Sequence, residues 1–141
     1  MAKREDRKGA IRALVRSEKI RTQKELVERL LAHGFDCTQA TVSRDIGEMG
    51  LAKSEDGFYA LPEDMALKRL MTEHVRSVEE AGNLIVIKTR SGSASMVGEL
   101  IDNMSIEGLV GTIAGDNTIM LAVKTAERAS ELVGELDAMI P

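Results

Sequence analysis

The pattern of apolar and polar positions changes partway along this chain of 141 residues. Up to residue 61, apolar residues recur every three or four positions within polar segments, as they do in amphipathic helices. Beyond residue 74 the apolar residues gather in short runs, and Leu84-Ile85-Val86-Ile87 is entirely aliphatic, which is typical of a strand buried on both faces. The length suits one ordinary domain or two small ones. The change in pattern favours two.

Three helices and a hairpin are predicted in the first module. Residues 3–17 are predicted to form a helix whose apolar residues share one face. Thr22 and Glu25 have the spacing of a capping box that begins a second helix. A third helix is expected from Thr38, which can cap it, to Gly50, which can end it in the left-handed conformation. Asp56-Gly57 predicts a tight turn between two short strands. This order is that of a winged helix-turn-helix domain.

The third helix shows the clearest chemical pattern. Val42, Ile46 and Met49 form one narrow apolar stripe, and Gly47 on the opposite side would let the backbone approach a surface closely. That opposite face also carries Thr41, Ser43 and Arg44, and Gln39 projects from the first turn. Arginine can bind guanine and glutamine can bind adenine through paired hydrogen bonds, while small hydroxyl groups reach phosphates. The pattern indicates a recognition helix, although a solvated surface helix could show the same residues.

The charge balance differs between the two halves. Residues 1–61 contain 12 Lys and Arg residues against 10 Asp and Glu residues, a net charge of +2, whereas residues 62–141 contain 7 against 13, a net charge of −6. This asymmetry predicts two modules with different partners. The chain has only three aromatic residues, so base stacking, the usual device for single strands, has little to use. Duplex DNA is therefore the favoured nucleic acid.

Basic residues recur every fourth position in the first predicted helix. They are Arg4, Lys8, Arg12 and Arg16. A stripe of this kind could contact phosphates along a DNA backbone, or it could simply be a solvated helix face.

The second module reads as ββαββα. The expected elements are strands 75–78, 84–89, 109–114 and 119–123, and helices 93–103 and 126–139. This order predicts an α+β domain, with an antiparallel sheet and helices on one side. The other face of the sheet would need a cover, which self-association commonly supplies. The predicted boundaries are a DNA-binding domain over 1–62, a partly helical linker over 63–73 and a ligand-binding and oligomerisation domain over 74–141.

Several function classes find no support in the sequence. The single Cys37 excludes an intrachain disulfide, and the two isolated histidines have no metal-ligand spacing, so no metal is expected. No apolar run is long enough to cross a membrane, and the start lacks a signal region, which predicts a cytoplasmic protein. Asp116 could in principle act as an acid or base, but no nucleophile–base arrangement or phosphate loop accompanies it. An enzyme is not expected.

A second stretch of interest is Gly111-Thr-Ile-Ala-Gly-Asp-Asn-Thr118, which contains an acidic turn between two apolar strands. Its spacing alone favours an ordinary hairpin. However, Thr38-Gln-Ala-Thr-Val-Ser-Arg-Asp-Ile46 and Gly111-Thr-Ile-Ala-Gly-Asp116 both resemble signatures of the bacterial arginine repressor family. Ile87-Lys-Thr-x-x-Gly-x-Ala94 resembles the segment before that family's ligand-side helix, so the similarity extends over nearly the whole chain.

The resemblance implies a transcriptional regulator of arginine metabolism. In such a protein the second domain trimerises, two trimers form a homohexamer with L-arginine as co-repressor between them, and the hexamer binds palindromic operators in double-stranded DNA. Ser43 and Arg44 would contact DNA most directly, with Gln39 and Thr41 beside them. In the second domain Asp116 would face the cationic ligand. Ala94 and Asp102 would line the same pocket.

Two positions depart from the family pattern. Asn117 stands where the family usually has a second aspartate, and Ser95 stands where it often has a glutamine. A carboxylate only accepts hydrogen bonds, which suits a guanidinium group that only donates them, whereas an asparagine also carries donors and lacks the charge. We therefore keep an alternative, a DNA-binding relative whose response to arginine is weakened, absent or shifted to a neutral amino acid such as citrulline.

Overall fold

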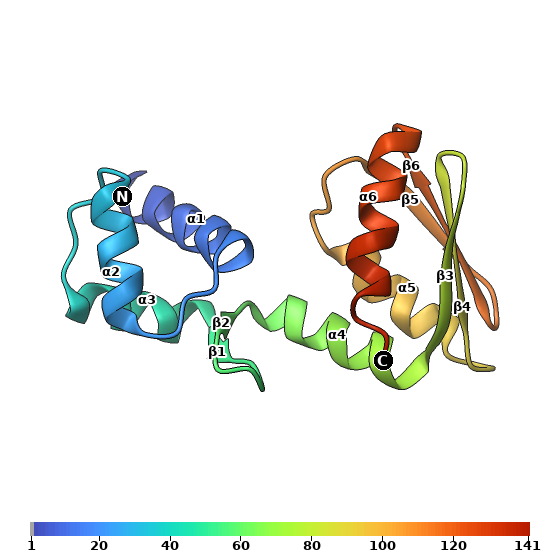
Figure 1. Cartoon of the computed structure of the whole chain (residues 1–141), viewed down its shortest axis with the longest axis horizontal. Coiled ribbons are helices and arrows are strands. Elements are labelled where there is room, and N and C mark those ends of the chain that lie inside the picture. The colour runs from blue at the N-terminus through green and yellow to red at the C-terminus, as the bar shows by residue number, and fades with distance from the viewer. Residues whose placement is uncertain (1) are drawn as a thin grey trace. The chain divides into compact units, whose positions relative to one another are not determined.

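The computed structural model describes the backbone of residues 2–141 and the side chains of residues 6–141. The chain divides into two compact units between Met65 and Ala66, inside helix α4 (Pro62–His74) (Figure 1). None of the helices in the described part of the chain is long and apolar enough to cross a membrane.

The first unit contains three helices and a small hairpin. Its elements are α1 (Ala2–Ser17), α2 (Gln23–Ala32), α3 (Gln39–Met49), β1 (Ala52–Lys53), β2 (Tyr59–Ala60) and the start of α4. Strands β1 and β2 pair antiparallel and form the wing, whose turn needs a positive φ of 83° at Gly57. The predicted winged helix-turn-helix is confirmed.

Local capping explains where the helices begin and end. Thr22 accepts a hydrogen bond from the backbone N–H of Glu25 at 3.1 Å, and Glu25 in return accepts from the N–H of Arg21 at 3.0 Å. The reciprocal bond thus comes from the residue before the cap and not, as expected, from Thr22. Thr38 caps α3, and Gly50 ends it with a φ of 68°.

The buried residues of the first unit come from all three helices and the segments around the wing. They include Ile11, Leu14, Ile20, Leu26, Leu30, Val42, Ile46, Leu51 and Leu61. The periodicity of each helix places these residues on one side. As a result, α3 has an inward stripe and a face left open to solvent.

The second unit is a four-stranded antiparallel sheet with helices on one side, as predicted. Its elements are β3 (Val75–Ala81), β4 (Leu84–Thr89), α5 (Ala94–Asn103), β5 (Leu109–Ala114), β6 (Thr118–Val123) and α6 (Ala126–Asp137). The strand order is β3-β4-β6-β5. Helix α5 packs over β5 and β6, and α6 packs over β3 and β4 (Figure 1). The second half of α4 adds Leu67 and Met71 to this core.

Strand β3 is longer than the sequence predicted. Glu79, Glu80 and Ala81 continue the pairing with β4, and only Gly82 and Asn83 form the turn. The charges at these positions suggested a loop, but β3 is an edge strand, where charged side chains can face water.

The sheet has one face in the core and one face open. Ile85, Ile87, Ile119 and Leu121 are fully buried beneath the helices. Leu84 and Val86, on the opposite face, remain half-buried, so the expected burial of β4 on both faces is wrong within one chain. Alternate residues of a strand point to opposite faces, and helices cover only one of them.

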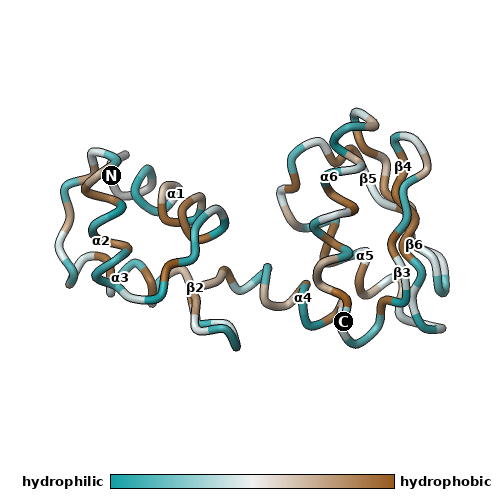
Figure 2. The backbone as a smooth tube through the Cα atoms, viewed as in Figure 1, coloured by the Kyte–Doolittle hydropathy of each residue, from teal (hydrophilic) through white to brown (hydrophobic). Residues whose placement is uncertain are grey.

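The open face is strongly apolar. Ile113 on β5 lies opposite Met120 on β6, which in turn lies opposite Val86 on β4. Ile113 is 76% exposed, Met120 is 43% exposed, and Val110 at an irregularity of β5 is 66% exposed. The hydrophobic stretches of these strands are brown in Figure 2. We call Val86, Val110, Ile113 and Met120 the open apolar face.

Candidate functional site

Helix α3 presents most of its predicted DNA-facing residues to solvent. Gln39, Ser43 and Arg44 are exposed, whereas Val42 and Ile46 are buried and set the rotation of the helix. Thr41 is only half-buried, and its hydroxyl group lies 3.0 Å from that of Thr38. The predicted residues therefore lie together at the start and outer side of one helix, with Thr41 turned partly inward.

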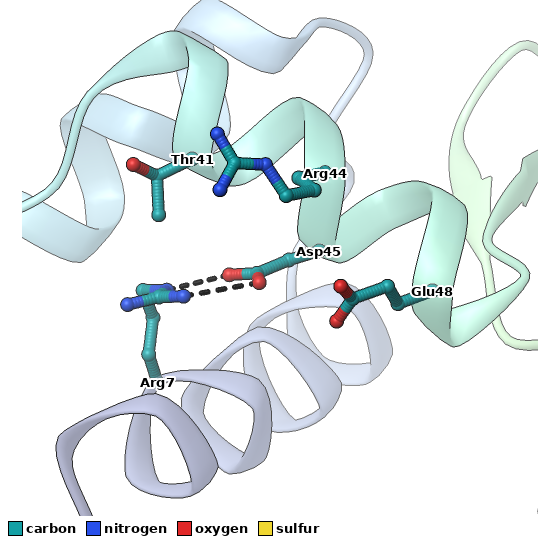
Figure 3. A pocket seen from close by; sticks show the side chains of 5 residues that line it. All are labelled: Arg7, Thr41, Arg44, Asp45 and Glu48. Carbon is teal, nitrogen blue, oxygen red and sulfur yellow. Dashed lines mark hydrogen bonds and ion pairs between the residues drawn. The ribbon is translucent and has the colours of Figure 1, made fainter. Parts of the chain in front are cut away.

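An ion pair that the sequence analysis missed joins α3 to α1. Asp45 is only 2% exposed, and its Oδ2 accepts from Nε of Arg7 at 2.5 Å while its Oδ1 accepts from Nη2 at 3.0 Å (Figure 3). This contact raises the pKa of the Arg7 guanidinium group, mainly through the hydrogen bond to Asp45. Asp45 comes three residues after Val42 and four residues before Met49, so the helical spacing places it beside the apolar stripe of α3. A charge at an inward position requires a partner, and that signal was available in the sequence.

The basic side chains of α1 that the structure describes are paired within the protein. Lys8 contacts Glu48 on α3 at 2.6 Å, Arg12 contacts Glu63, and Arg16 forms two bonds with Asp64, at 2.9 and 3.0 Å. Acidic residues of α3 and α4 thus form ion pairs with the three cations that we considered for phosphate contacts. The remaining residue of the stripe is Arg4, whose side chain lies outside the part of the chain that the structure describes.

Arg44 differs from those cations. Among the side chains that the structure describes, no hydrogen bond or ion pair to Arg44 is found, although Asp45 and Glu48 line the same hollow (Figure 3). Arg7 and Lys8 hold those two acids instead. Arg44 is therefore a solvent-facing guanidinium group with its donors available.

Three further cations lie beside the aromatic residues of the wing: Lys53 belongs to β1, whereas Lys19 and Arg21 come from the segment between α1 and α2. The guanidinium group of Arg21 lies 4.3 Å from the centre of the Phe58 ring, and the ammonium group of Lys19 lies 5.4 Å from the same ring. Lys53 lies 5.6 Å from the ring of Tyr59. Cation–π contacts hold these side chains beside the hairpin. In the sequence the few aromatic residues indicated only that base stacking is disfavoured, and this arrangement was not predicted.

The acidic turn of the second unit is fixed by backbone hydrogen bonds. The carbonyl of Asp116 accepts from the N–H groups of Gly92 and Ala94 at 3.1 and 3.2 Å, and the Asp116 carboxylate accepts from Gly92 at 3.1 Å. The carbonyl of Asn117 accepts from the N–H of Thr89 at 2.8 Å. The turn between β5 and β6 therefore rests on the segment that leads from β4 into α5.

The predicted ligand residues are partly brought together. Asp116 and Asn117 are exposed in the turn, and the backbone of Ala94 is bonded to it, while the side chain of Ala94 is fully buried. Ser95 follows in the first turn of α5 and is exposed. Asp102 shares that helix but comes seven residues after Ser95, about 10 Å along the axis. It lies at the other end of α5 from the turn.

Within the described residues, no group of three or more His, Cys, Asp or Glu side chains is placed to hold a metal ion. The positions that stand out are instead an exposed arginine on a capped helix and an exposed aspartate in a hydrogen-bonded turn.

Comparison with known proteins assigns both units. Residues 2–66 match the family model for the DNA-binding domain of the arginine repressor, and residues 71–138 match the model for its C-terminal domain. The chain is 44% identical to an arginine repressor of Thermus thermophilus, with 99% of this chain and 92% of that protein aligned.

Two further arginine repressors show the same relationship. The protein of Carboxydothermus hydrogenoformans is 42% identical over 95% of this chain and 97% of its own length. That of Halothermothrix orenii is 41% identical over 90% and 92%. These matches extend over both units, and they bear out the resemblance found in the sequence. The chain belongs to the arginine repressor family, a family of DNA-binding transcriptional regulators rather than enzymes.

Proposed function

We propose that this chain is a regulator of arginine metabolism that binds palindromic operator DNA as a homohexamer, with L-arginine as co-repressor. Residues 1–62 would bind DNA, residues 74–141 would bind the ligand and assemble, and residues 63–73 would link the two domains. The protein would act in the cytoplasm. The observation that carries this proposal is Arg44, exposed on a capped helix and without an ion-pair partner among the described side chains, in a chain of this family.

The DNA contacts are assigned to α3. Arg44 would bind a base edge and Ser43 a base or phosphate, with Gln39 and Thr41 beside them. The burial of Val42 supports this assignment, since it holds the polar face of α3 outward. One arginine–base contact contributes about 1–3 kcal/mol of discrimination, so several copies of α3 must act together on one operator.

The ligand is assigned to the turn of Asp116. Its Oδ1 accepts one backbone hydrogen bond, and a carboxylate can accept several, so acceptor capacity remains for a guanidinium group. Asn117, Ala94, Ser95 and, from the far end of α5, Asp102 would complete the pocket together with neighbouring subunits. The Oδ1 of Asn117 accepts from the hydroxyl group of Thr118 at 3.1 Å. An amide at this position supports the alternative of weakened arginine binding or a preference for a neutral ligand such as citrulline.

Assembly into trimers and hexamers is supported by the open apolar face. Ile113 and Met120 expose aliphatic surface on a rigid sheet, and burying such surface releases about 25 cal/mol per Å². A ligand bound between subunits would then favour the form that presents several copies of α3 together.

The test is fluorescence anisotropy of a labelled duplex that carries paired palindromic arginine-type operators, at fixed salt. The duplex is titrated with the full chain alone, with L-arginine and with L-citrulline, and Arg44→Ala is the control variant. Stronger binding with arginine, lost in Arg44→Ala, is the expected result. Equal binding in all three conditions would show that arginine is not a co-repressor of this chain. If the wild type does not bind the duplex, the DNA-binding assignment is wrong.

A further inference from the structure

Helix α3 carries more acidic than basic charge, which is unexpected for a helix that faces DNA. Its charged residues are Arg44, Asp45 and Glu48, one cation against two anions. Because DNA is a polyanion, unpaired carboxylates near its backbone weaken binding. Two neighbouring residues of α1, Arg7 and Lys8, contact these two anions.

The two contacts differ in geometry and burial. Lys8 meets Glu48 at a partly exposed position, and an ammonium group on a flexible stem imposes little direction. Arg7 meets Asp45 with two parallel hydrogen bonds, and the side chain of Asp45 is only 3% exposed. A planar guanidinium group matched to a buried carboxylate holds both the distance and the relative rotation of the two helices.

The position of this pair links it to Arg44. Figure 3 shows Arg7 and Asp45 in one hollow with Thr41, Arg44 and Glu48. If Arg7 were missing, the carboxylate of Asp45 would be left buried without its cation, and Arg44 is another cation that lines the same hollow. A buried carboxylate without a partner attracts any cation within reach. Arg44 would then turn inward, away from the DNA-facing side.

We propose that Arg7 is a positioning residue for DNA recognition, because its two-bonded ion pair with Asp45 fixes α3 against α1 and leaves Arg44 available to bind bases. This inference rests on the proposed function, in which α3 reads DNA. It assigns to α1 a role in sequence discrimination that does not require α1 to touch a base.

The structure supplies a matched control on the same helix. Arg16 of α1 also forms two hydrogen bonds with an aspartate, Asp64, but both side chains are partly exposed, and this pair holds α1 to α4 instead of α3. Arg16→Met therefore removes the same kind of pair from the same helix without touching the recognition helix.

The experiment first selects a preferred duplex from a random library with the wild-type full chain. The dissociation constants for that duplex and for a scrambled duplex of equal length are then measured by anisotropy at two salt concentrations. We expect Arg7→Met to reduce the ratio of the two constants at least tenfold, Arg7→Lys to reduce it less, and Arg16→Met to change it less than twofold. If Arg7→Met weakens both duplexes equally, the positioning role is wrong.

A second arm tests the capture of Arg44. The double variant Arg7→Met with Asp45→Asn removes the stranded anion, and we expect its discrimination ratio to be at least threefold above that of Arg7→Met. No recovery would overturn the capture of Arg44. If Arg7→Met does not fold by circular dichroism, Arg7→Lys decides, since normal discrimination in that folded variant overturns the proposal. A wild-type selection that enriches no sequence would contradict the proposed function itself.

Discussion

The two units of this chain fix the surfaces that we propose to be functional by different means. In the first unit, side-chain ion pairs such as Arg7–Asp45 and Lys8–Glu48 tie a polar helix face to the helix beside it. In the second unit, backbone hydrogen bonds hold the Asp116 turn, and the surface left open on the sheet is apolar.

The difference is between a polar surface that one chain can expose by itself and an apolar surface that is more stable when another surface covers it. The polar face of α3 is solvated by water, so the first unit can present it alone. Exposed apolar side chains such as Ile113 and Val110 cost free energy until another surface covers them, which supports the proposed assembly of the second unit. A side-chain pair can also be removed by truncating one side chain, whereas the backbone bonds at Asp116 do not depend on the side chains of the residues that form them. The following predictions test this contrast.

The largest effect is expected from a charge on the open apolar face. Ile113→Glu would place a carboxylate in the surface that we propose to be buried between subunits, and burying an unpaired charge is costly. Sedimentation should show loss of the hexamer, and affinity for a paired operator should fall on the order of a hundredfold or more. The matched control is Leu31→Glu, because Leu31 is a 49% exposed leucine of the first unit. An intact hexamer in Ile113→Glu would move the interface elsewhere.

Next in size is the cost of breaking the buried ion pair. Arg7→Met should lower the free energy of unfolding by about 3 kcal/mol, because it leaves the carboxylate of Asp45 buried without its cation. Arg16→Met should lower it by less than about 1 kcal/mol, because that pair is partly exposed to water. Urea denaturation of both variants measures the difference. Equal losses would show that burial does not distinguish the two pairs.

A smaller change is expected at the ligand turn. Asn117→Asp adds an acceptor and a negative charge beside Asp116, and one charge-assisted hydrogen bond contributes roughly 1.5–3 kcal/mol. Calorimetry should show arginine binding that is on the order of tenfold tighter or more, with citrulline binding unchanged or weaker. Arginine affinity that stays the same in Asn117→Asp would place that side chain outside the pocket.

The smallest effect concerns the backbone of α3. Apart from its chain neighbours and the nearby backbone of its own helix, a Cβ at Gly47 would meet no atom of the described residues within 4 Å. Gly47→Ala should therefore stabilise the helix by up to about 1 kcal/mol. Operator affinity should nevertheless fall severalfold if this side of α3 lies against DNA. Gly9→Ala in α1 is the control, since its Cβ is equally unobstructed. We expect Gly9→Ala to raise the melting temperature without changing DNA affinity. If Gly9→Ala also weakens DNA binding, the effect of Gly47→Ala is not specific to α3.

Several features were predictable because they depend on neighbours in sequence. Thr38 and Gly50 mark the ends of α3 through local hydrogen bonds and a local backbone angle, and both act as predicted. The same holds for the turn at Gly57 and for the motifs that indicated the family. Strand β3 was underestimated, because charged residues can belong to an edge strand or a loop, and only pairing with β4 distinguishes them.

The order of elements, the helix ends and the family membership were thus determined by the sequence itself, because capping, periodicity and motif spacing act over a few residues. Only the tertiary structure showed that Arg7 reaches Asp45, which lies 38 positions away, or that three residues of the basic stripe are held by acids. Lys8, Arg12 and Arg16 contact Glu48, Glu63 and Asp64, respectively. The reason is physical. An ion pair depends on which helix faces pack together, and packing is decided by the whole core rather than by the residues beside the charge.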